Sequence, residues 1–325
     1  MSARPPCVTC VVPVHNGERF LAATLESIAL QKRRPDRLVI LDNCSTDRTG
    51  ELIQQCIARH PELRVEWRRH EKNLGSLVNF NLALDYAAET EFLHLISHDD
   101  LLEPDFFARL VPTLENVPGR ALAYCGLTLI NERDEVTRPY LGPKGHQPMV
   151  LSRERFLAQQ SELNNVYCQT VLLRTAYQPP PIHFLAGWQQ AADVVFFAEW
   201  AMHCEKIVAV PEPLCRYRQH PASASGANSA NLQAWVLEEW RAMQTVSALI
   251  SESDFRRWLR RQKLKCVFGA RSRVKMKQMQ PQNPAYAEDI GIATRTIVSP
   301  LHWILGGAAV VLRDGLCLLR TMRGG

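Results

Sequence analysis

Two adjacent carboxylates, Asp99 and Asp100, end an apolar run that begins at Phe92. An unbroken apolar block of this length predicts a buried strand, and the body of such a strand does not accommodate two Asp side chains. The pair is therefore expected at the carboxyl end of the strand, which faces the ligand crevice in an open α/β sheet. Paired carboxylates there suit a hard divalent cation that holds phosphate oxygens. The alternative is that the pair starts the next helix, because Asp is a good N-cap residue.

Three earlier apolar runs also end in polar loops, and each loop is followed by a helical pattern. Residues 8–14 and 37–41 are typical of buried strands, and residues 63–67 alternate as an edge strand does. Thr46 or Asp47 is the expected N-cap of the helix through Ile53. Repeated strand, loop and helix units predict a parallel, doubly wound α/β sheet whose polar loops gather at one edge. The residues expected at that edge are His15, Asn16, Asp42, Asn43, Asn73, Asp99 and Asp100.

The second half of the chain continues with shorter elements. Strands are predicted over residues 121–130, 165–173 and 208–211. The loop at 140–150 is long enough to move over a ligand. Ala192 and Asp193 open a helix that runs to residue 203. The stretch 221–231, rich in Ala, Ser, Gly and Asn, is typical of a linker. We therefore expect one domain over residues 1–225 and a helical extension over residues 226–325.

The charge is unevenly distributed. The chain has 325 residues, of which 46% are hydrophobic and 22% charged, as in an ordinary globular protein. Its formal net charge is +5. Residues 226–325 hold 15 Lys and Arg against 7 Asp and Glu, whereas the rest of the chain holds 23 against 26. The basic character belongs to the extension, which favours an anionic surface there over a chain-wide nucleic-acid binder.

The extension is basic and amphipathic. Residues 254–277 hold ten Lys and Arg against one acid, with aromatic residues interleaved. A further helix is expected from Ser299 and Pro300, with apolar residues along one face over 299–320, and its apolar part is too short to span a bilayer. Both segments fit the surface of an anionic membrane. A solvated basic helix and a nucleic-acid-binding tail are the alternatives.

The cysteines and the N-terminus indicate a cytoplasmic protein. Ten Cys in a chain of this length form no small secreted framework and are expected as reduced thiols. Cys7 and Cys10 match C-x-x-C, but they fall in a strand-like run, where positions three apart point to opposite faces. The first residues carry Pro5 and Pro6 and no long apolar segment, so no signal peptide is expected.

Several enzyme classes that use such a sheet lack their motif here. The first turn has no G-x-G-x-x-G, and the chain has neither a G-x-x-x-x-G-K-[ST] phosphate loop nor a G-x-S-x-G elbow. A nicotinamide dehydrogenase, a P-loop enzyme and the usual hydrolase of this fold are therefore disfavoured.

Six separate blocks together resemble the family-two glycosyltransferases of the GT-A fold. They are Pro13-Val14-His15-Asn16-Gly17, residues 42–47, Asn73-Leu74-Gly75 with Asn79 and Asn81, His98-Asp99-Asp100, Ala192-Asp193, and residues 211–220. The resemblance covers residues 7–225 and does not extend over the basic tail. It implies a Rossmann-like, mostly parallel sheet with helices on both faces.

The resemblance also implies a function and a set of site residues. A nucleoside-diphosphate sugar would lie across the carboxyl edge, with Mg²⁺ or Mn²⁺ held on its diphosphate by Asp99 and Asp100. Asp193 would be the general base that deprotonates an acceptor hydroxyl for inversion, with a helix N-cap as its alternative role. Arg218 and His220 would lie near the diphosphate, or serve in the core or at the surface. The donor-binding residues implied are Pro13, Val14, His15, Asn16, Glu18, Asp42, Asn43, Ser45, Asn73, Gly75, Asn79, Asp99, Arg218 and His220.

Two positions depart from the family pattern. Asn43 and Ser97 each stand at a position where the family usually has Asp. The Q-x-x-R-W signature of processive synthases is also missing. We therefore expect transfer of one sugar at a time. The expected acceptor is a glycan or a lipid-linked molecule of the cell surface. The basic, amphipathic tail places the expected reaction at the inner face of the membrane. A non-catalytic, nucleotide-binding scaffold of the same fold is the competing interpretation.

Overall fold

The structure is a computed structural model that describes residues 7–163 and 166–308. The chain folds into two compact units, which are described separately. The first comprises Met1–Phe156, Asn165–Gly187 and Ala192–Pro221, and the second comprises Leu157–Asn164, Trp188–Ala191 and Ala222–Gly325. The domain boundary expected at residue 225 stays a prediction.

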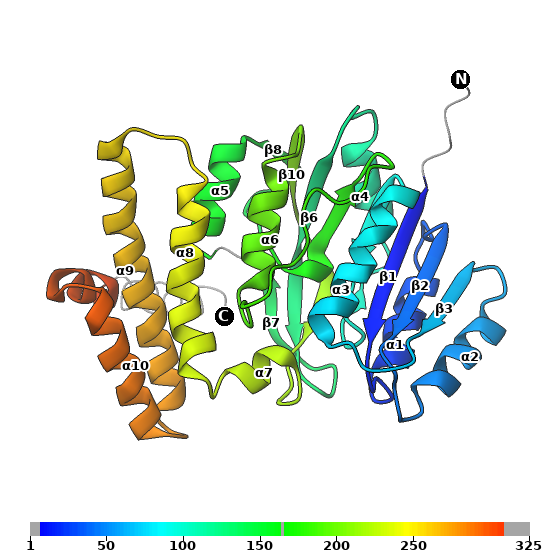
Figure 1. The fold of residues 1–325 in the computed structure, drawn as a ribbon, viewed down its shortest axis with the longest axis horizontal. Coiled ribbons are helices and arrows are strands. Elements are labelled where there is room, and N and C mark those ends of the chain that lie inside the picture. The colour runs from blue at the N-terminus through cyan, green and yellow to red at the C-terminus, as the bar shows by residue number, and fades with distance from the viewer. Residues whose placement is uncertain (1–6, 164–165, 309–325) are drawn as a thin grey trace, which may run out of the picture. The chain divides into compact units, whose positions relative to one another are not determined.

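The first unit alternates strands and helices in its first half (Figure 1). Its order is β1 (Val8–Val14), α1 (Leu21–Ala29), β2 (Arg37–Asp42), α2 (Thr49–Arg59), β3 (Val65–Arg69), α3 (Ser76–Asp85), η1 (Tyr86–Glu89), β4 (Phe92–Leu95), β5 (Leu101–Leu102), α4 (Phe106–Leu114), β6 (Ala121–Ile130), β7 (Val136–Leu141), β8 (Met149–Leu151), α5 (Arg153–Ser161), η2 (Cys168–Thr170), β9 (Val171–Arg174), α6 (Ala192–Ala201) and β10 (Lys206–Arg218). The last residues of α5 belong to the second unit.

All of these strands form one sheet, in the order β3-β2-β1-β4-β9-β6-β10-β5, with β7 on β6 and β8 on β10. The pairs β2–β3, β1–β2, β1–β4 and β6–β10 are parallel, whereas β9 runs antiparallel between β4 and β6. The pairs β5–β10, β6–β7 and β8–β10 are also antiparallel, so the sheet is mixed, and its parallel part comprises β3-β2-β1-β4 and the pair β6–β10. As expected, β3 is an edge strand. The carboxyl ends of β1, β2 and β4 meet at one edge of the sheet.

Helices cover both faces of this sheet. Alternate residues of β1, such as Val8 and Val12, pack with α1, α2 and α4, whereas Val11 packs with α3 and α6 on the opposite face. This alternation follows from the two-residue period of a strand. It explains why the central strands read as unbroken apolar runs, because both sides of each strand are buried. The predicted fold class is confirmed.

Several elements differ from their sequence-based prediction. The strand expected at 208–211 extends over Lys206–Arg218, and the expected strand 165–173 is a short 3₁₀ turn followed by β9. The loop at 140–150 contains the end of β7 and the start of β8. The helix after β2 has Arg48 at its N-cap, and the Asp47 carboxylate accepts from Thr49 N at 3.0 Å.

The second unit is helical. It contains α7 (Ala224–Asn228), a π-helical turn η3 (Gln233–Leu237), α8 (Glu238–Ala248), α9 (Asp254–Met279) and α10 (Pro284–Ile297), followed by helical residues 300–308. Helix α9 packs against both α8 and α10 (Figure 1). The stretch expected as a linker holds α7, whose N-cap Ser223 accepts from Gly226 N. Within the described residues, no helix combines the length and apolar character needed to cross a membrane. Residues 309–320 of the expected last helix lie outside the described part.

Candidate active site

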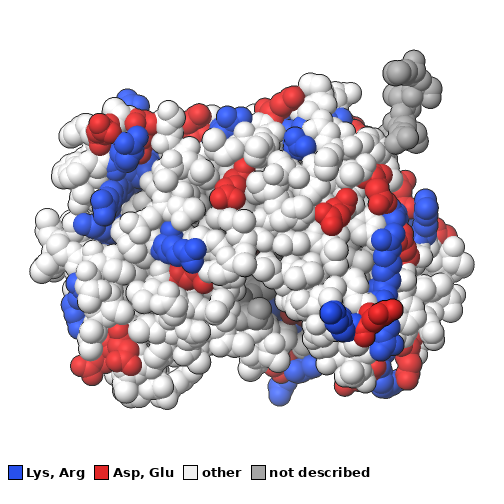
Figure 2. Space-filling view, in the orientation of Figure 1, with Lys and Arg blue, Asp and Glu red and all other residues white. Residues whose placement is uncertain are grey.

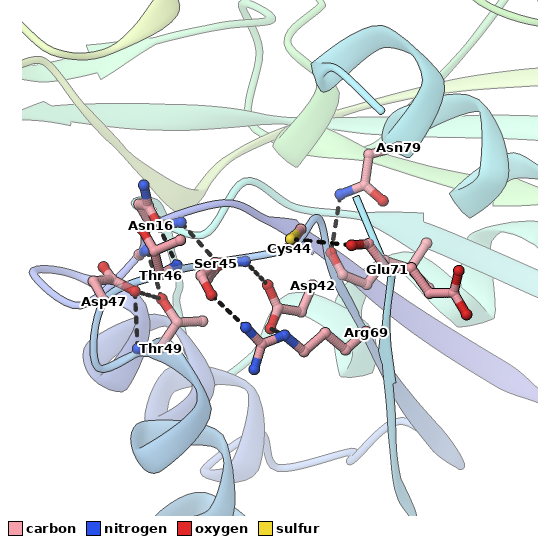
Figure 3. Close-up of polar contacts among 12 residues, drawn as sticks. Asn16, Asp42, Cys44, Ser45, Thr46, Asp47, Thr49, Arg69, Glu71 and Asn79 are labelled. Carbon is pink, nitrogen blue, oxygen red and sulfur yellow. Dashed lines mark hydrogen bonds and ion pairs between the residues drawn. The ribbon is translucent and has the colours of Figure 1, made fainter. Parts of the chain in front are cut away.

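The loops after β1 and β2 hold each other through side chains (Figure 3). Asp42 Oδ1 accepts from Ser45 N at 2.8 Å, and Ser45 Oγ accepts from Asn16 N at 2.9 Å. Asn16 Oδ1 in turn accepts from Thr46 N at 2.8 Å. Asn16 and Cys44 have φ values of 51° and 62°, in the left-handed region. The two loops therefore form one fixed polar surface at the carboxyl ends of their strands.

The Asp42 carboxylate is fully buried at this surface. Its Oδ2 atom accepts no hydrogen bond among the described residues and lies 3.7 Å from Arg69 Nε. Arg69, at the end of β3, also donates to Ser45 O at 2.7 Å. Sequence reasoning missed Arg69, although its position at the end of the third strand was a usable signal. A buried acceptor without a donor is rare, and it can be satisfied by the N–H of a ligand.

Asn43, Asn73 and His15 form a second polar group beside the first. Asn43 Nδ2 donates to Asn73 Oδ1 at 2.9 Å, and Asn43 Oδ1 accepts from Leu74 N at 2.8 Å. Asn73 Nδ2 lies 3.1 Å from His15 Nε2. Gly75 follows with φ 86°, a conformation that other residues rarely adopt. The structure thus brings together residues that are 58 positions apart in the sequence.

Some residues expected at the donor site are occupied by contacts within the protein. Asn79 is buried, and its amide donates to Leu41 O at 2.9 Å and lies 3.1 Å from His70 Nε2. Glu18 Oε2 accepts from Arg48 N at 3.3 Å. Pro13 and Val14 lie within β1, and Val14 O accepts from Asn43 N at 2.8 Å. Their assignment to donor binding stays a prediction, and the contacts favour a role in shaping the loops.

The acid pair follows β4 and contacts the end of β10. Asp99 Oδ2 lies 3.0 Å from His220 Nε2, and Asp100 Oδ1 accepts from Arg218 N at 2.8 Å. The Arg218 guanidinium is buried and donates to Asp99 O at 2.8 Å. The next helix begins only at Phe106, with Asp105 at its N-cap, so the interpretation of the pair as a helix cap is wrong.

Arg218 and His220 are further fixed by an aromatic ring that sequence reasoning missed. Phe20 lies beneath the guanidinium at 4.6 Å and beside the imidazole at 4.9 Å between ring centroids. Arg218 also pairs with Asp134 at 2.6 Å. Both residues predicted near the diphosphate, Arg218 and His220, therefore contact the acid pair and are held in place by Phe20.

The acid pair fits a divalent cation on electrostatic grounds. Burial raises the pKa of the Asp100 carboxyl well above its ordinary value, and the neighbouring Asp99 charge raises it further. The Arg218 charge lowers the pKa of Asp100 and offsets only part of these two effects, and a bound cation would supply further positive charge. Among the described residues, no group of three or more His, Cys, Asp or Glu side chains is placed to hold a metal. A pair of carboxylates that shares Mg²⁺ with substrate phosphates is a usual arrangement for that ion.

Asp193 lies in the first turn of α6, and its Oδ1 accepts from Val194 N at 2.8 Å. The thiol of Cys168, at the start of η2, relates it to the acid pair. Burial raises the pKa of that thiol, and the charges of Asp193 and Asp100 raise it further. The Cys168 thiol lies at the end of β4, where its Sγ is 3.9 Å from Leu95 O.

A mixed sheet with this polar edge and helices on both faces matches the GT-A fold of glycosyltransferases. Residues 9–178, just over half of the chain, match Glycosyl transferase family 2. The chain belongs to this family.

Two relatives from Bacillus subtilis are named as glycosyltransferases. EpsJ is 22% identical over 223 residues, which cover 67% of this chain and 62% of EpsJ. TuaG, named for teichuronic acid biosynthesis, is 28% identical over 119 residues, which cover 37% of this chain and 45% of TuaG. The matches span 13% of a relative from Sinorhizobium fredii and 57% of one from Mycobacterium bovis, so they represent part of the length of those proteins.

Solved structures share the fold over nearly the whole chain. The structure of S. aureus TarS 1-349 in complex with UDP-GlcNAc superposes with a TM-score of 0.55 and 17% identity, covering 95% of this chain and 92% of the 1-349 chain. The mannosyltransferase PcManGT from Pyrobaculum calidifontis, in complex with GDP-Man and Mn²⁺, gives a TM-score of 0.55 and 14% identity, covering 95% and 88%. At these identities the likeness concerns the fold.

Proposed function

We propose that this glycosyltransferase moves one sugar, with inversion, from a nucleoside-diphosphate sugar to a hydroxyl of a glycan or lipid-linked acceptor in cell-surface polysaccharide synthesis. The observation that carries the proposal is the buried pair of Asp99 and Asp100 at the same sheet edge as the loops of Asp42 and Asn43. The assignment of TuaG to teichuronic acid biosynthesis supports the acceptor class, and the complex of TarS with UDP-GlcNAc supports the donor class.

The two loop groups would hold the nucleoside. Asp42 Oδ2 is a buried acceptor that a base N–H can satisfy, and Arg69 Nε lies 3.7 Å from it. Asn43, Asn73 and His15 present amide and imidazole groups at the neighbouring position. The nucleoside would therefore be bound by groups whose geometry is fixed before the donor arrives, so less conformational entropy is lost on binding.

Asp99 and Asp100 would hold Mg²⁺ or Mn²⁺, and that ion would stabilise the negative charge that develops on the departing diphosphate. Arg218 fixes the pair by holding Asp99 O and donating its backbone N–H to Asp100. His220 orients Asp99 through Oδ2. Ser97 stands where a third acid is usual, so the protein contributes two carboxylates at this point.

Asp193 would act as the general base. Its carboxylate takes the proton from the acceptor hydroxyl, the hydroxyl oxygen bonds to the anomeric carbon, and the bond to the diphosphate breaks on the opposite side. The proton stays on Asp193, the electron pair of the broken bond leaves with the nucleoside diphosphate, and the sugar inverts its anomeric configuration. This role agrees with the position of Asp193 in the first turn of a helix.

We further propose that the protein acts at the cytoplasmic face of the membrane, bound through residues 254–277 and 299–320. Exposed apolar side chains from two elements support this: Phe255, Trp258 and Leu259 on α9, and Leu301, Ile304 and Leu305 on the helix at 300–308. Apolar residues with basic neighbours are typical of helices that lie in the membrane interface. Binding to vesicles tests this proposal.

A panel of nucleotide sugars tests the donor class. The melting temperature is measured with UDP-glucose, UDP-GlcNAc, UDP-galactose and GDP-mannose, with and without Mn²⁺. The donor should stabilise the folded state by about 2.7 kcal/mol at 100 times its Kd. Asp100→Asn keeps the acceptor for Arg218 N and should lose the Mn²⁺-dependent part of the shift, whereas Asp254→Asn, an exposed carboxylate, should keep all of it. No shift with any donor, or an equal shift in both variants, would contradict the proposal.

A further inference from the structure

The residues just before α6 are held by the helical unit of the chain. Trp188–Ala191 belong to the compact unit that contains α7 and α8, although α6 itself does not. Ala191 directly precedes α6 and has no side-chain acceptor with which to cap the helix. The backbone N–H groups at this point therefore need an acceptor from elsewhere in the chain.

Glu238, the first residue of α8, supplies that acceptor. Its Oε1 accepts from Gln190 N at 2.6 Å and from Ala191 N at 2.7 Å. Gln189 N donates to both oxygens, at 2.9 Å and 3.0 Å. The Glu238 side chain is buried, and three successive N–H groups converge on its single carboxylate. Hydrogen bonds to a charged acceptor are about twice as strong as neutral ones, and a negative charge is favourable near a helix N-terminus.

Two more side chains of the same unit complete the contact. Asn228 Nδ2 donates to Gln189 O at 3.1 Å and lies 3.2 Å from Gln190 Oε1. The Arg241 guanidinium lies 4.0 Å above the ring of Trp188. Residues 188–191 are thus fixed through backbone donors, a backbone acceptor and an aromatic ring, which leaves them little freedom.

We propose that Glu238 is a positioning residue for Asp193. It fixes residues 189–191, and Asp193 follows Ala191 by two peptide bonds, so the carboxylate of Glu238 sets where α6 begins and where the base points. The inference rests on the role of Asp193 proposed above. It gives the helical extension a part in the reaction that does not depend on membrane binding.

Donor hydrolysis tests the inference, because water takes the place of the unidentified acceptor. The donor is the member of the nucleotide-sugar panel that gives the largest Mn²⁺-dependent thermal shift, and released nucleoside diphosphate is measured in the full-length chain. Glu238→Gln keeps the size of the side chain but loses its charge and one acceptor oxygen. We expect its kcat to fall by about 10- to 100-fold, with the donor KM and the melting temperature little changed, because a misplaced base slows the chemical step.

Glu239→Gln is the matched control. Glu239 is the next residue of α8 and is also buried, but it pairs with Arg271 and Lys275 of α9 instead of residues 188–191. Its kcat should stay within about 2-fold of wild type, and hydrogen exchange at residues 189–191 should quicken in Glu238→Gln and not in Glu239→Gln. Equal kcat in the two variants would overturn the positioning role.

The Asp193→Asn background separates this inference from the proposed function. If Asp193 is the base and Glu238 acts through it, Glu238→Gln should lower kcat no further in that background. A further loss of about 10-fold would show that Glu238 acts independently of Asp193 and overturn the inference. An Asp193→Asn variant with wild-type turnover would instead overturn the role of Asp193 itself, and the inference with it. An inactive Asp193→Asn beside a fully active Glu238→Gln would overturn the positioning alone.

Discussion

Asn43 shows how a departure from the family pattern is accommodated by its neighbours. Its Nδ2 donates to Asn73 Oδ1, and its Oδ1 accepts from Leu74 N. A carboxylate could keep the second contact, but it has no proton with which to make the first. The two asparagines therefore form a matched pair, which the Asp usual at this position could not reproduce.

Asn43→Asp should lower the free energy of unfolding by about 1–3 kcal/mol, because a buried carboxylate would face the Asn73 carbonyl oxygen without a donor between them. Urea unfolding measures the change. Asn283→Asp serves as the control, because the Asn283 side chain accepts from Tyr286 N, and Asp accepts equally well. If both variants are as stable as wild type, the pairing of Asn43 with Asn73 contributes nothing.

Some residues of the site can be predicted from the sequence, and others cannot. Asp42, Asn43, Asp99 and Asp100 follow apolar runs directly, so the rule that ligands bind at strand ends is enough to place them. Arg69 ends the third strand, so the same rule could have found it. Phe20 and Glu238 act through contacts with residues far away in the chain, and no local pattern distinguishes them from other charged or aromatic residues. Their roles require the tertiary structure.

At the scale of elements, the apolar strands were predicted and the irregular ones were not. Residues 8–14, 37–41 and 121–130 are continuous apolar runs that both faces of the sheet bury. The last strand was predicted over residues 208–211, but β10 continues past Pro211 and Pro213 with register shifts between Val210 and Cys215. Bulges allow proline within a paired strand. The antiparallel insertion of β9 depends on long-range pairing and leaves no local signal.

Ion pairs within the protein neutralise part of the positive charge of helix α9. Arg260 pairs with Glu252 at 2.9 Å, and Glu239 lies between Arg271 and Lys275 at 2.7 Å and 2.9 Å. On the face in Figure 2, Lys and Arg over α9 lie beside Asp and Glu. Because part of the charge is neutralised within the protein, the exposed apolar side chains should dominate any binding to a membrane.

Replacing Phe255, Trp258 and Leu259 together by Ser should therefore weaken membrane binding by more than about 10-fold, since each buried apolar side chain contributes about 1.5–3 kcal/mol. Co-flotation with vesicles of phosphatidylcholine and phosphatidylglycerol measures the bound fraction. The double variant Arg256→Gln, Arg261→Gln removes two exposed charges of the same helix and should weaken membrane binding less than the triple variant does. Equal binding by wild type and the triple variant would mean that α9 does not contact the membrane.

At the scale of the whole molecule, each unit has a separate proposed task. The sheet unit holds the loops, the acid pair and Asp193, and the helical unit holds the residues before Asp193 and carries the exposed apolar side chains. The family and the fold could be identified from six short blocks of sequence, because the GT-A sheet places its polar residues at strand ends. Membrane binding by the helical unit was predicted from its basic, amphipathic sequence, whereas the contact of Glu238 with residues 189–191 was not, because it depends on the tertiary structure.

The most direct test of this account compares donor binding with turnover in Asp193→Asn. Donor Kd is measured by calorimetry with Mn²⁺, and hydrolysis of the same donor gives kcat, with Glu199→Gln of the same helix as the control. We predict a donor Kd within about 2-fold of wild type and a kcat lower by about 10²- to 10⁴-fold, the usual contribution of a general base. Equal losses of binding and turnover, or turnover at the wild-type rate, would contradict the assignment of Asp193 as the base.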